Sequence, residues 1–441
     1  MLPMKYHIWT EGCQMNVADS QRLASALERL GYEPGSRAEE ADLIVLNTCV
    51  VRQSAEDKAY GRLSSLKPLK KNNPDLIIGL MGCLVGMKDD PKLRERFPWV
   101  DVFAPPSNPI PLVTFIAERD GKKQGEAEQA IRYAQMDEEL VIPPSQVGKA
   151  VCVNVPIVLG CSHACTYCVI PYRRGVERSR PPEEIFHEVE KLVDQGVREV
   201  TLLGQIVDRY GKDNPEWPNL SGLIRQLHEI EGLQRIRFLT SHPNWMTDDL
   251  LDTIAELPKV MPHVEIPVQA GDDAVLNTMR RGYTADAFRK LIEKIRARIP
   301  GVSIGTDIIV GFPGESEEQF QNTYDLLEEL RLDVAHLARY SPRPQTWAAR
   351  NLKDDVPSDQ KWERFRRLEA LQEKIAAQIH SSYLNREVEV LFEDKSKNRW
   401  RGRTPTNKLA FVELDEDLHG QIRKVRITRA GAWSLNGELV G

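Results

Sequence analysis

The sequence predicts an α/β protein with three parts: an N-terminal open parallel-sheet domain, a central partial (βα)6 barrel and a C-terminal small β-barrel. Strand-like apolar runs alternate with helical patterns over residues 5–98, and the same alternation returns over residues 151–340. Such alternation is typical of parallel sheets. Residues 381–441 hold short strand-like runs separated by turns. A chain of 441 residues is long enough for several domains.

The same patterns divide the chain into four segments. Few large apolar residues lie between Glu118 and Gly148, where glycine and proline recur, and this composition predicts a linker. The expected segments are 1–120 for the N-terminal domain, 121–148 for the linker, 149–378 for the central barrel and 379–441 for the β-barrel.

Three strand-like runs of the N-terminal domain each end in a cysteine: KYHIWTEGC, ADLIVLNTC and DLIIGLMGC. In open α/β sheets, ligands bind outside the carboxyl ends of the strands. Cys13, Cys49 and Cys83 could therefore converge on one site although they are far apart in the sequence. Free cysteines are also often simply buried in the core, which stays the alternative for each of them.

The central segment contains six strand-like runs with helical patterns between them. The runs are VCVNVPIVL, EVTLLG, RIRFLTS, HVEIPVQ, SIGTDIIVG and DVAHLARY. The helical patterns cover 182–196, 219–230, 247–257, 284–299 and 316–331. Helical crossovers between parallel strands give a βα barrel, and a full barrel has eight strands. We therefore expect a partial barrel.

The C-terminal segment predicts a small β-barrel with a basic surface. Residues 381–441 hold 11 Lys and Arg against 9 Asp and Glu, while the whole chain has a net charge of −6. Two basic groups stand out: Lys397, Arg399, Trp400, Arg401 and Arg403, and then Arg423, Lys424, Arg426 and Arg429. Small β-barrels with such surfaces often bind RNA, and we expect Trp400 to stack on a base. A solvated charged face is the alternative.

Composition and cysteine use indicate a cytoplasmic protein. No apolar run is long enough to span a membrane, and the first residues lack the features of a signal peptide. Seven cysteines in a cytosolic protein are more typical of metal binding or catalysis than of disulfides. Cys152 lies inside a predicted strand, and we interpret it as a core residue.

Cys161, Cys165 and Cys168 directly follow the first strand of the central barrel, on the face where barrel active sites lie. Thiolates bind both zinc and iron–sulfur clusters. A structural zinc site normally has four protein ligands, and no second CxxC or histidine pair follows at the expected spacing. The spacing CxxxCxxC favours a 4Fe–4S cluster whose fourth iron is open to another ligand. A zinc-dependent RNA-binding protein is the non-enzyme alternative.

CxxxCxxC after the first strand of a partial βα barrel resembles the signature of the radical S-adenosylmethionine enzymes. The resemblance implies that S-adenosylmethionine binds the open iron and is cleaved to a radical that abstracts hydrogen. Further blocks are similar to the methylthiotransferase family: CTYCVIPYRRGVERSRPPEEI, VTLLGQ, TSHP, PVQAGDDAVLNTMRRGYT, TDIIVGFPGE, TEGCQMN, LNTCVVR and MGC. Nearly the whole chain is covered.

This family resemblance implies that Cys13, Cys49 and Cys83 hold a second 4Fe–4S cluster and that the C-terminal β-barrel binds RNA. It implies no catalytic residue beyond the cluster ligands. The chain is most similar to members that methylthiolate carbon 2 of N6-(dimethylallyl)adenosine next to the tRNA anticodon, with S-adenosylmethionine as radical source and methyl donor. The implied partners are tRNA, a reductant such as flavodoxin or ferredoxin, and a sulfur donor. Threonylcarbamoyl-adenosine in tRNA, or an aspartate of a ribosomal protein, is the alternative substrate.

Six positions at expected strand ends or in the cluster loop are candidate cofactor contacts: Tyr167, Gly204, Gln205, Gln269, Gly311 and Gly314. The family places an aromatic residue against the adenine at the position of Tyr167, and GFPGE allows close backbone approach to a ligand. A packed loop aromatic and a plain turn are the alternatives. Arg173 and Arg174 follow the cluster loop and could pair with a carboxylate or phosphate, or form a solvated turn.

Two positions depart from the family pattern. Ile206 stands after the Gly-Gln pair where the family usually has Asn, and Gln345-Thr346-Trp347 follows YSPRP where the family usually has Gly-Thr-Pro. Both lie at predicted strand ends that face the site, so they bear on substrate choice.

Overall fold

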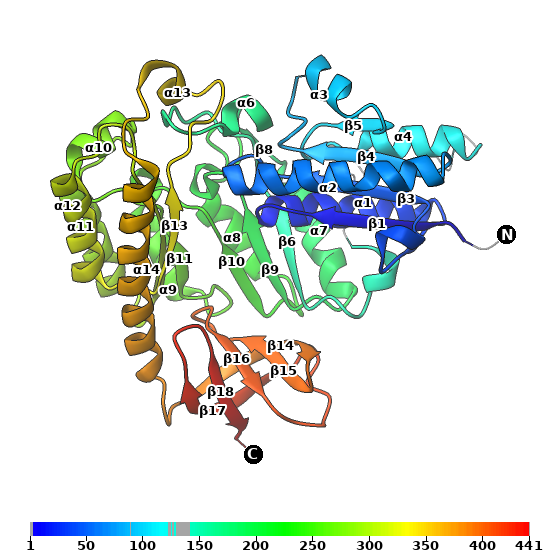
Figure 1. Cartoon of the computed structure of the whole chain (residues 1–441). Helices are drawn as coiled ribbons and strands as arrows, with labels where there is room; N and C mark the ends of the chain where they lie inside the picture. The colour runs from blue at the N-terminus through cyan, green and yellow to red at the C-terminus, as the bar shows by residue number, and fades with distance from the viewer. Residues whose placement is uncertain (1–2, 89, 122–124, 126–127, 129–141, 441) are drawn as a thin grey trace. The chain divides into compact units, whose positions relative to one another are not determined.

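The computed structural model describes residues 3–88, 90–121, 125, 128 and 142–440 (Figure 1), so most of the predicted linker lies outside the described residues. The chain packs as two compact units. Unit 1 comprises Met1–His163, Cys168–Gln195 and Leu203–Gln205, and unit 2 comprises Ala164–Tyr167, Gly196–Leu202 and Ile206–Gly441. Within the described ranges, no helix is long and apolar enough to cross a membrane.

The core of unit 1 is a parallel five-stranded sheet with the order β2-β1-β3-β4-β5. Its strands are β1 (Lys5–Thr10), β2 (Glu33–Pro34), β3 (Leu43–Thr48), β4 (Ile77–Gly82) and β5 (Val102–Ala104). The three longest are the strands expected from the sequence. Every residue of β3 and β4 is buried, as expected of parallel strands with both faces covered.

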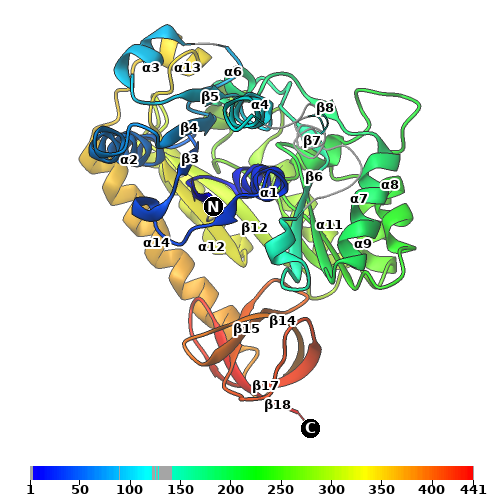
Figure 2. The ribbon, with the colours of Figure 1, turned by 90° about the vertical axis from the view of Figure 1, so that its right-hand side faces the viewer.

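Helices cover both faces of this sheet (Figure 2). They are α1 (Gln14–Arg29), α2 (Gln53–Asn72), α3 (Pro91–Arg96) and α4 (Ile110–Arg119), with a 3-10 turn η1 (Ala38–Glu40). Alternate residues of β3 belong to different cores: Val45 packs with α1 and α4, whereas Ile44 and Leu46 pack with α2 and α3. Because successive side chains of a strand point to opposite faces, each face of the sheet has its own hydrophobic core, and β3 contributes to both.

The remainder of unit 1 follows the linker. Its elements are η2 (Pro144–Gln146), β6 (Cys152–Pro156), β7 (Val158–Leu159), α6 (Ile170–Arg174), β8 (Arg178–Ser179) and α7 (Pro182–Asp194). Glu188 of α7 accepts from Arg22 of α1 at 2.8 Å and lies 2.5 Å from Arg180, and all three side chains are buried. A buried carboxylate needs such partners, so this network fixes α7 against the N-terminal sheet domain.

Unit 2 contains a parallel array of five strands that follow one another in sequence. They are β9 (Glu199–Leu203), β10 (Arg235–Phe238), β11 (His263–Glu265), β12 (Ser303–Val310) and β13 (Val334–Arg339). Regular ladders join β9 to β10 and β11 to β12 and β13. Isolated hydrogen bonds continue the array from β10 to β11, such as Ser241 N–H to the Glu265 carbonyl at 2.9 Å. These are five of the six strands expected for the partial barrel; the first expected strand corresponds to β6, which belongs to unit 1.

Helices of unit 2 alternate with these strands. The helical elements are η3 (Val207–Arg209), α8 (Leu220–His228), η4 (Pro243–Trp245), α9 (Asp248–Glu256), α10 (Asp273–Thr278), α11 (Ala285–Arg298), α12 (Glu317–Leu330), α13 (Trp347–Asn351) and α14 (Ser358–Ser381). Side-chain caps begin most of them, as at Ser316, which forms a capping box with Gln319. The sequence patterns predicted α8, α9, α11 and α12, whereas α10, α13 and α14 were not predicted.

After α14 the chain forms a closed barrel with the strand order β14-β15-β16-β18-β17 (Figures 1 and 2, orange to red). The strands are β14 (Glu387–Ser396), β15 (Arg399–Arg403), β16 (Leu409–Val412), β17 (Ile422–Ala430) and β18 (Leu435–Leu439). Closure removes the free sheet edges. The predicted small β-barrel is confirmed, although β18 was not among the expected strands.

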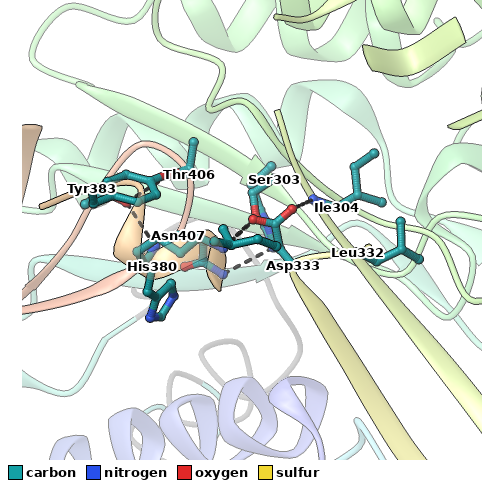
Figure 3. Close-up of polar contacts among 12 residues, drawn as sticks. Ser303, Ile304, Leu332, Asp333, His380, Tyr383, Thr406 and Asn407 are labelled. Carbon is teal, nitrogen blue, oxygen red and sulfur yellow. Dashed lines mark hydrogen bonds and ion pairs between the residues drawn. The ribbon is translucent and has the colours of Figure 1, made fainter. Parts of the chain in front are cut away.

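The loop between β15 and β16 anchors this barrel to the amino ends of the parallel strands. Arg237 donates to the carbonyls of Thr404 and Pro405, each at 2.8 Å, and to Glu199 at 2.7 Å. Lys408 pairs with Asp333 at 2.5 Å. Asp333 also accepts from the Ile304 N–H at 2.9 Å (Figure 3). These charged groups are largely buried and each has a partner, so the barrel is held in place by polar contacts.

Candidate active site

The structure brings Cys13, Cys49 and Cys83 to the same edge of the unit 1 sheet. Cys13 precedes α1, whereas Cys49 and Cys83 directly follow β3 and β4. A Cβ added to Gly12 would lie 2.9 Å from Cβ of Cys49, and the Cys83 N–H donates to the Thr48 carbonyl at 2.9 Å. The strand-end argument therefore placed these residues correctly in space; their role as cluster ligands stays a prediction.

Two buried asparagines hold the backbone around these cysteines. Asn16 Nδ2 donates to Oδ1 of Asn47 at 2.8 Å and to the Thr48 carbonyl at 3.1 Å, and Asn47 Nδ2 donates back to the Asn16 carbonyl at 2.8 Å. The Cys13 thiol donates to Oδ1 of Asn16 at 3.3 Å. Buried amides with several hydrogen-bond partners fix the local backbone geometry. The two asparagines therefore help to fix the positions of the neighbouring cysteines.

A buried cation lies beside the same cysteines. Nη1 of Arg174 lies 3.4 Å from Oδ2 of Asp19 and 3.0 Å from Oγ of Ser107, and the side chains of Arg174 and Asp19 are 3% and 0% exposed. Burial by itself lowers the pKa of Arg174, but Cys83, Asp19 and Cys13 raise it above its ordinary value. Arg174 therefore stays charged. It pairs with a carboxylate, which is one of the possibilities that the sequence left open for this residue.

The thiols themselves are shifted towards the neutral form. Burial raises the pKa of the Cys49 thiol to about 12, and Cys83 adds to the shift. Burial also raises the pKa of the Cys83 thiol, which the nearby Arg174 guanidinium opposes. Thiols must lose their protons to bind a metal, so binding here would release protons and gain from the adjacent cation.

The segment with Cys161, Cys165 and Cys168 crosses from unit 1 to unit 2 and back. On the unit 1 side, the Cys161 N–H donates to the Gly175 carbonyl at 3.1 Å. On the unit 2 side, Nη1 of Arg281 donates to Sγ of Cys165 at 3.1 Å. Chain connectivity keeps the three cysteines within eight consecutive residues.

Unit 2 holds the middle of this segment by backbone contacts. The Thr166 N–H donates to the Met279 carbonyl at 3.1 Å, its hydroxyl donates to the Thr278 carbonyl at 2.9 Å, and its own carbonyl accepts from the Ala348 N–H at 2.9 Å. Residues at the end of α10 and the start of α13 therefore hold Thr166 through hydrogen bonds. Tyr167 packs beside the apolar cluster that contains Met279 and Ala348.

Other candidate cofactor contacts lie at or near strand ends as expected, and their role stays a prediction. Gly204 and Gln205 follow β9, and Gln269 lies beyond β11 with a φ of 75°. Gly311 has its own packing reason for lacking a side chain, because a Cβ there would lie 2.3 Å from Cγ of Lys361. Gly314 adopts a φ of 80°, and its N–H donates to Asp355 at 2.8 Å.

Four residues with positive φ that are not glycine lie near the carboxyl ends of the unit 2 strands, and others in unit 2 lie elsewhere, such as Arg331 and Asn385. Thr240 follows β10, Gln269 follows β11 and Gln345 follows β13, with φ of 66°, 75° and 74°. Arg280, just after α10, has a φ of 56°. Such conformations are costly for residues with a Cβ and concentrate at functional sites. This edge of the array is therefore the candidate active face of unit 2.

The two departures from the family pattern lie on this edge of unit 2. Ile206 is buried and precedes η3. Trp347 is the first residue of α13, which Thr346 caps by accepting from the Ala349 N–H at 3.3 Å. The Arg280 guanidinium lies over the Trp347 ring, 4.8 Å from its centroid.

The expectation that Trp400 stacks on a base is wrong. Trp400 is 7% exposed, belongs to the core of the C-terminal barrel and donates from Nε1 to the Glu416 carbonyl at 2.8 Å. The residues on either side of it in β15 lie on the opposite face, because strand residues alternate. The exposed tryptophan of the barrel is Trp433, at 61%.

The donor sets fit the iron–sulfur clusters that the sequence suggests. Each set consists of three cysteines, with a buried guanidinium beside at least one of them: Arg174 beside Cys83 and Cys13, and Arg281 beside Cys165. Thiolates are the ligands of such clusters, and each one caps a different iron. Among the described residues, no three His, Cys, Asp or Glu side chains are grouped to hold a single metal ion. Cysteine thiolates are the ligands that a cluster requires, and a nearby cation stabilises them.

Sequence reasoning missed the residues that support these cysteines. Arg281 contacts a cysteine 116 positions away, and Asn16 and Asn47 meet across 31 positions. Their signals are present, since Asn16 and Asn47 lie three and two residues from a cysteine and Arg281 lies in RRGYT. Only the fold shows that these polar residues converge.

Three stretches of the chain match known protein families. Residues 155–327 match the Radical SAM superfamily, 5–105 match the uncharacterized protein family UPF0004 and 381–440 match the TRAM domain. A solved radical S-adenosylmethionine methyltransferase from Kitasatospora setae shares the fold with a TM-score of 0.54 and 16% identity, over 79% of this chain and 77% of that chain.

Curated relatives match over nearly the full length. A protein of Roseiflexus sp. (strain RS-1) is 48% identical over 99% of this chain and 89% of its own length. A protein of Herpetosiphon aurantiacus is 47% identical over 99% of this chain and 98% of its own length. Both are named tRNA-2-methylthio-N(6)-dimethylallyladenosine synthase. The chain is a radical S-adenosylmethionine enzyme and belongs to the tRNA-2-methylthio-N(6)-dimethylallyladenosine synthase family.

Proposed function

We propose that this protein methylthiolates carbon 2 of N6-(dimethylallyl)adenosine next to the tRNA anticodon. The observation that carries the proposal is identity of 47–48% along almost the whole chain with relatives named for this product. In the reaction the C2–H bond breaks and a C2–S bond forms. The methyl group comes from S-adenosylmethionine, and the hydrogen leaves with the adenosyl group of a second S-adenosylmethionine.

The radical S-adenosylmethionine domain implies a 4Fe–4S cluster and S-adenosylmethionine. When bound, this cluster supplies the electron that cleaves S-adenosylmethionine. Cys161, Cys165 and Cys168 would be its protein ligands. Arg281 keeps a positive charge 3.1 Å from Sγ of Cys165 and thereby stabilises the thiolate. Tyr167, Gly204, Gln205, Gln269, Gly311 and Gly314 would orient S-adenosylmethionine at the strand ends.

Cys13, Cys49 and Cys83 would hold a second 4Fe–4S cluster that serves sulfur insertion. Support comes from their convergence at one sheet edge, from the Asn16–Asn47 network that fixes the backbone and from the buried Arg174. The guanidinium offsets part of the negative charge of three thiolates. Three thiols at one edge with a cation beside them match the donor chemistry of such a cluster.

The tRNA is the substrate that the relatives' names and the TRAM match support. The reaction needs two further partners, one that supplies electrons and one that supplies sulfur. A reductant such as flavodoxin or ferredoxin would supply electrons, and a sulfur donor would supply the inserted atom.

The test is mass spectrometry of nucleosides from tRNA of a strain that lacks the encoding gene. We expect 2-methylthio-N6-(dimethylallyl)adenosine to disappear and to return when the gene is restored. Loss of a methylthio derivative of threonylcarbamoyl-adenosine instead, or of methylthio-aspartate from a ribosomal protein, would assign the alternative substrate. Unchanged nucleosides and ribosomal proteins would refute a methylthiotransferase.

A further inference from the structure

We propose that the Arg280–Trp347 pair is a stacking platform for an unpaired base next to the adenosine that is modified. The inference rests on the proposed function and deepens it by naming a residue that determines how the RNA loop is held. Its starting point is that the exposed Arg280 guanidinium lies over the half-buried Trp347 ring, near the carboxyl ends of the unit 2 strands.

The first support is the place of the pair in unit 2. Arg280 comes directly after Met279, whose carbonyl accepts from the Thr166 N–H at 3.1 Å. Trp347 comes directly before Ala348, whose N–H donates to the Thr166 carbonyl at 2.9 Å. Thr166 is the residue after Cys165, so both members of the pair are one residue from a backbone contact with the cysteine segment.

The second support is that the pair is held in place although its outer member is exposed. The Arg280 guanidinium lies 4.8 Å from the centroid of the Trp347 ring, and Arg280 is exposed while Trp347 is half-buried. Arg280 adopts a φ of 56°, which is costly for arginine, and its N–H donates to the Asn277 carbonyl at 2.9 Å. Thr346, only 1% exposed, caps the helix that begins with Trp347.

The third support is chemical. Arg280 forms no ion pair within the part of the chain that the structure describes, in contrast to Arg289, which pairs with Glu329. Single-stranded RNA loops are recognised by stacking on aromatic rings and guanidinium planes, with arginine also available to phosphate. A base that stacks on this pair would have its sugar and phosphates beside an unpaired cation. An RNA loop therefore fits this surface better than an apolar partner.

The experiment measures binding of the full-length holoenzyme to a synthetic RNA hairpin whose loop carries N6-(dimethylallyl)adenosine, at one fixed salt concentration. Two further hairpins replace the 5′ or the 3′ neighbour of that adenosine with an abasic nucleotide. Trp347→Ala should weaken binding of the intact hairpin by about 5- to 150-fold, the range expected for one stacked base. One of the two abasic hairpins should bind the wild-type and Trp347→Ala enzymes equally.

Two variants control for packing and for unspecific aromatic contact. Trp347→Phe keeps a stacking ring and should retain most of the affinity, whereas an equal loss in Trp347→Phe and Trp347→Ala would reveal a packing role and overturn the proposal. Trp362 of α14 also lies under an arginine, Arg339, at 3.5 Å, and is 40% exposed. Trp362→Ala should leave binding within about 2-fold, because a surface contact away from the cysteine segment adds little.

Other outcomes separate this inference from the proposed function. If the wild-type enzyme binds and modifies the hairpin but Trp347→Ala binds equally well, only the stacking platform fails. The platform also fails if Trp347→Ala loses the same factor with both abasic hairpins, or if Trp362→Ala loses as much as Trp347→Ala. If the wild-type enzyme neither binds nor modifies the hairpin, both the function and the platform are refuted.

Discussion

Arg281 donates from Nη1 to Sγ of Cys165 at 3.1 Å and is only 4% exposed. Its other nitrogens are also used, since Nε donates to the Tyr283 hydroxyl at 2.9 Å and Nη2 to the Pro267 carbonyl at 3.0 Å. Burial by itself lowers the pKa of Arg281, but Tyr167, Tyr283 and Cys165 raise it above its ordinary value. A fixed cation therefore lies beside one member of the CxxxCxxC motif.

Replacing Arg281 with Gln should lower the rate of reductive S-adenosylmethionine cleavage by about 10- to 100-fold, the usual effect of losing a group that supports a metal ligand. Arg281→Lys keeps the charge and should lose less, although it cannot reproduce all three hydrogen bonds. The formation of 5′-deoxyadenosine without tRNA provides the measurement. Full activity of Arg281→Gln would show that the hydrogen bond to Cys165 has no functional effect.

Replacing Cys161, Cys165 and Cys168 together with Ala should leave about half of the iron, because the other three thiolates remain. This variant should not cleave S-adenosylmethionine. Iron analysis and the yield of 5′-deoxyadenosine check both statements. Loss of all iron would count against two separate sites.

The complementary variant replaces Cys13, Cys49 and Cys83 with Ala. It should also keep about half of the iron and should still form 5′-deoxyadenosine, because the CxxxCxxC thiolates remain. It should form no methylthio product. A normal yield of that product would remove the N-terminal cysteines from the mechanism.

Arg174→Gln should destabilise unit 1, because it leaves the buried Asp19 carboxylate without its cation; the expected loss is about 3–5 kcal/mol. The double variant Arg174→Gln/Asp19→Asn removes both charges and should recover much of the thermal midpoint. It should nevertheless bind less iron at the N-terminal cysteines, because no cation remains beside their thiolates. Full iron in the double variant would give Arg174 a purely structural role.

The strands of both parallel sheets could be predicted because burial on both faces produces continuous apolar runs, as in β3 and β4. The sequence also contains the information that corrects the expectation for Trp400. In the run RWRGR the alternation that identifies a strand also places Trp400 on the face opposite Arg399 and Arg401. The hydrogen bond between Arg281 and Cys165 could not be predicted, because no local sequence pattern indicates a contact between residues 116 positions apart.

Three exposed cations of the barrel, Lys397, Lys424 and Arg429, have no ion pair in the described ranges, whereas Arg426 pairs with Glu387 at 2.8 Å. Replacing these three with Gln should lower the slope of tRNA affinity against salt by up to about three, because each phosphate that is no longer neutralised lowers it by about one. Lys67, Lys71 and Lys92 of unit 1 offer a control with the same change of charge. An equal effect in both variants would mean that only net charge matters.

The last prediction concerns the anchor of the C-terminal barrel. Arg237 is 3% exposed and joins Glu199, at the start of β9, to the carbonyls of Thr404 and Pro405 in the barrel. This anchor lies at the amino ends of the parallel strands, whereas the partners of Thr166 follow the carboxyl ends of β11 and β13. In βα barrels the amino end serves stability and the carboxyl end chemistry. Loss of the anchor should therefore affect tRNA binding more than cleavage of S-adenosylmethionine.

Arg237→Leu removes the hydrogen bonds to Thr404 and Pro405 but keeps those of Arg235 to the Arg403 carbonyl and of Lys408 to Asp333. It leaves Glu199 buried with only Arg235, whose Nη1 lies 3.9 Å from it. We expect faster proteolysis between α14 and β14 and a higher KM for tRNA, because fewer contacts hold the barrel in its orientation. The rate of S-adenosylmethionine cleavage without tRNA should stay within about 2-fold of wild type. Arg237→Leu/Glu199→Gln should recover thermal stability, because no unpaired buried charge remains, yet keep the raised KM. Truncation after residue 378 is a less specific test, because it cuts α14 before its end at Ser381 and removes every acceptor of this anchor in the barrel. An unchanged KM in both Arg237 variants would show that the contacts of Arg237 with the barrel do not affect tRNA binding.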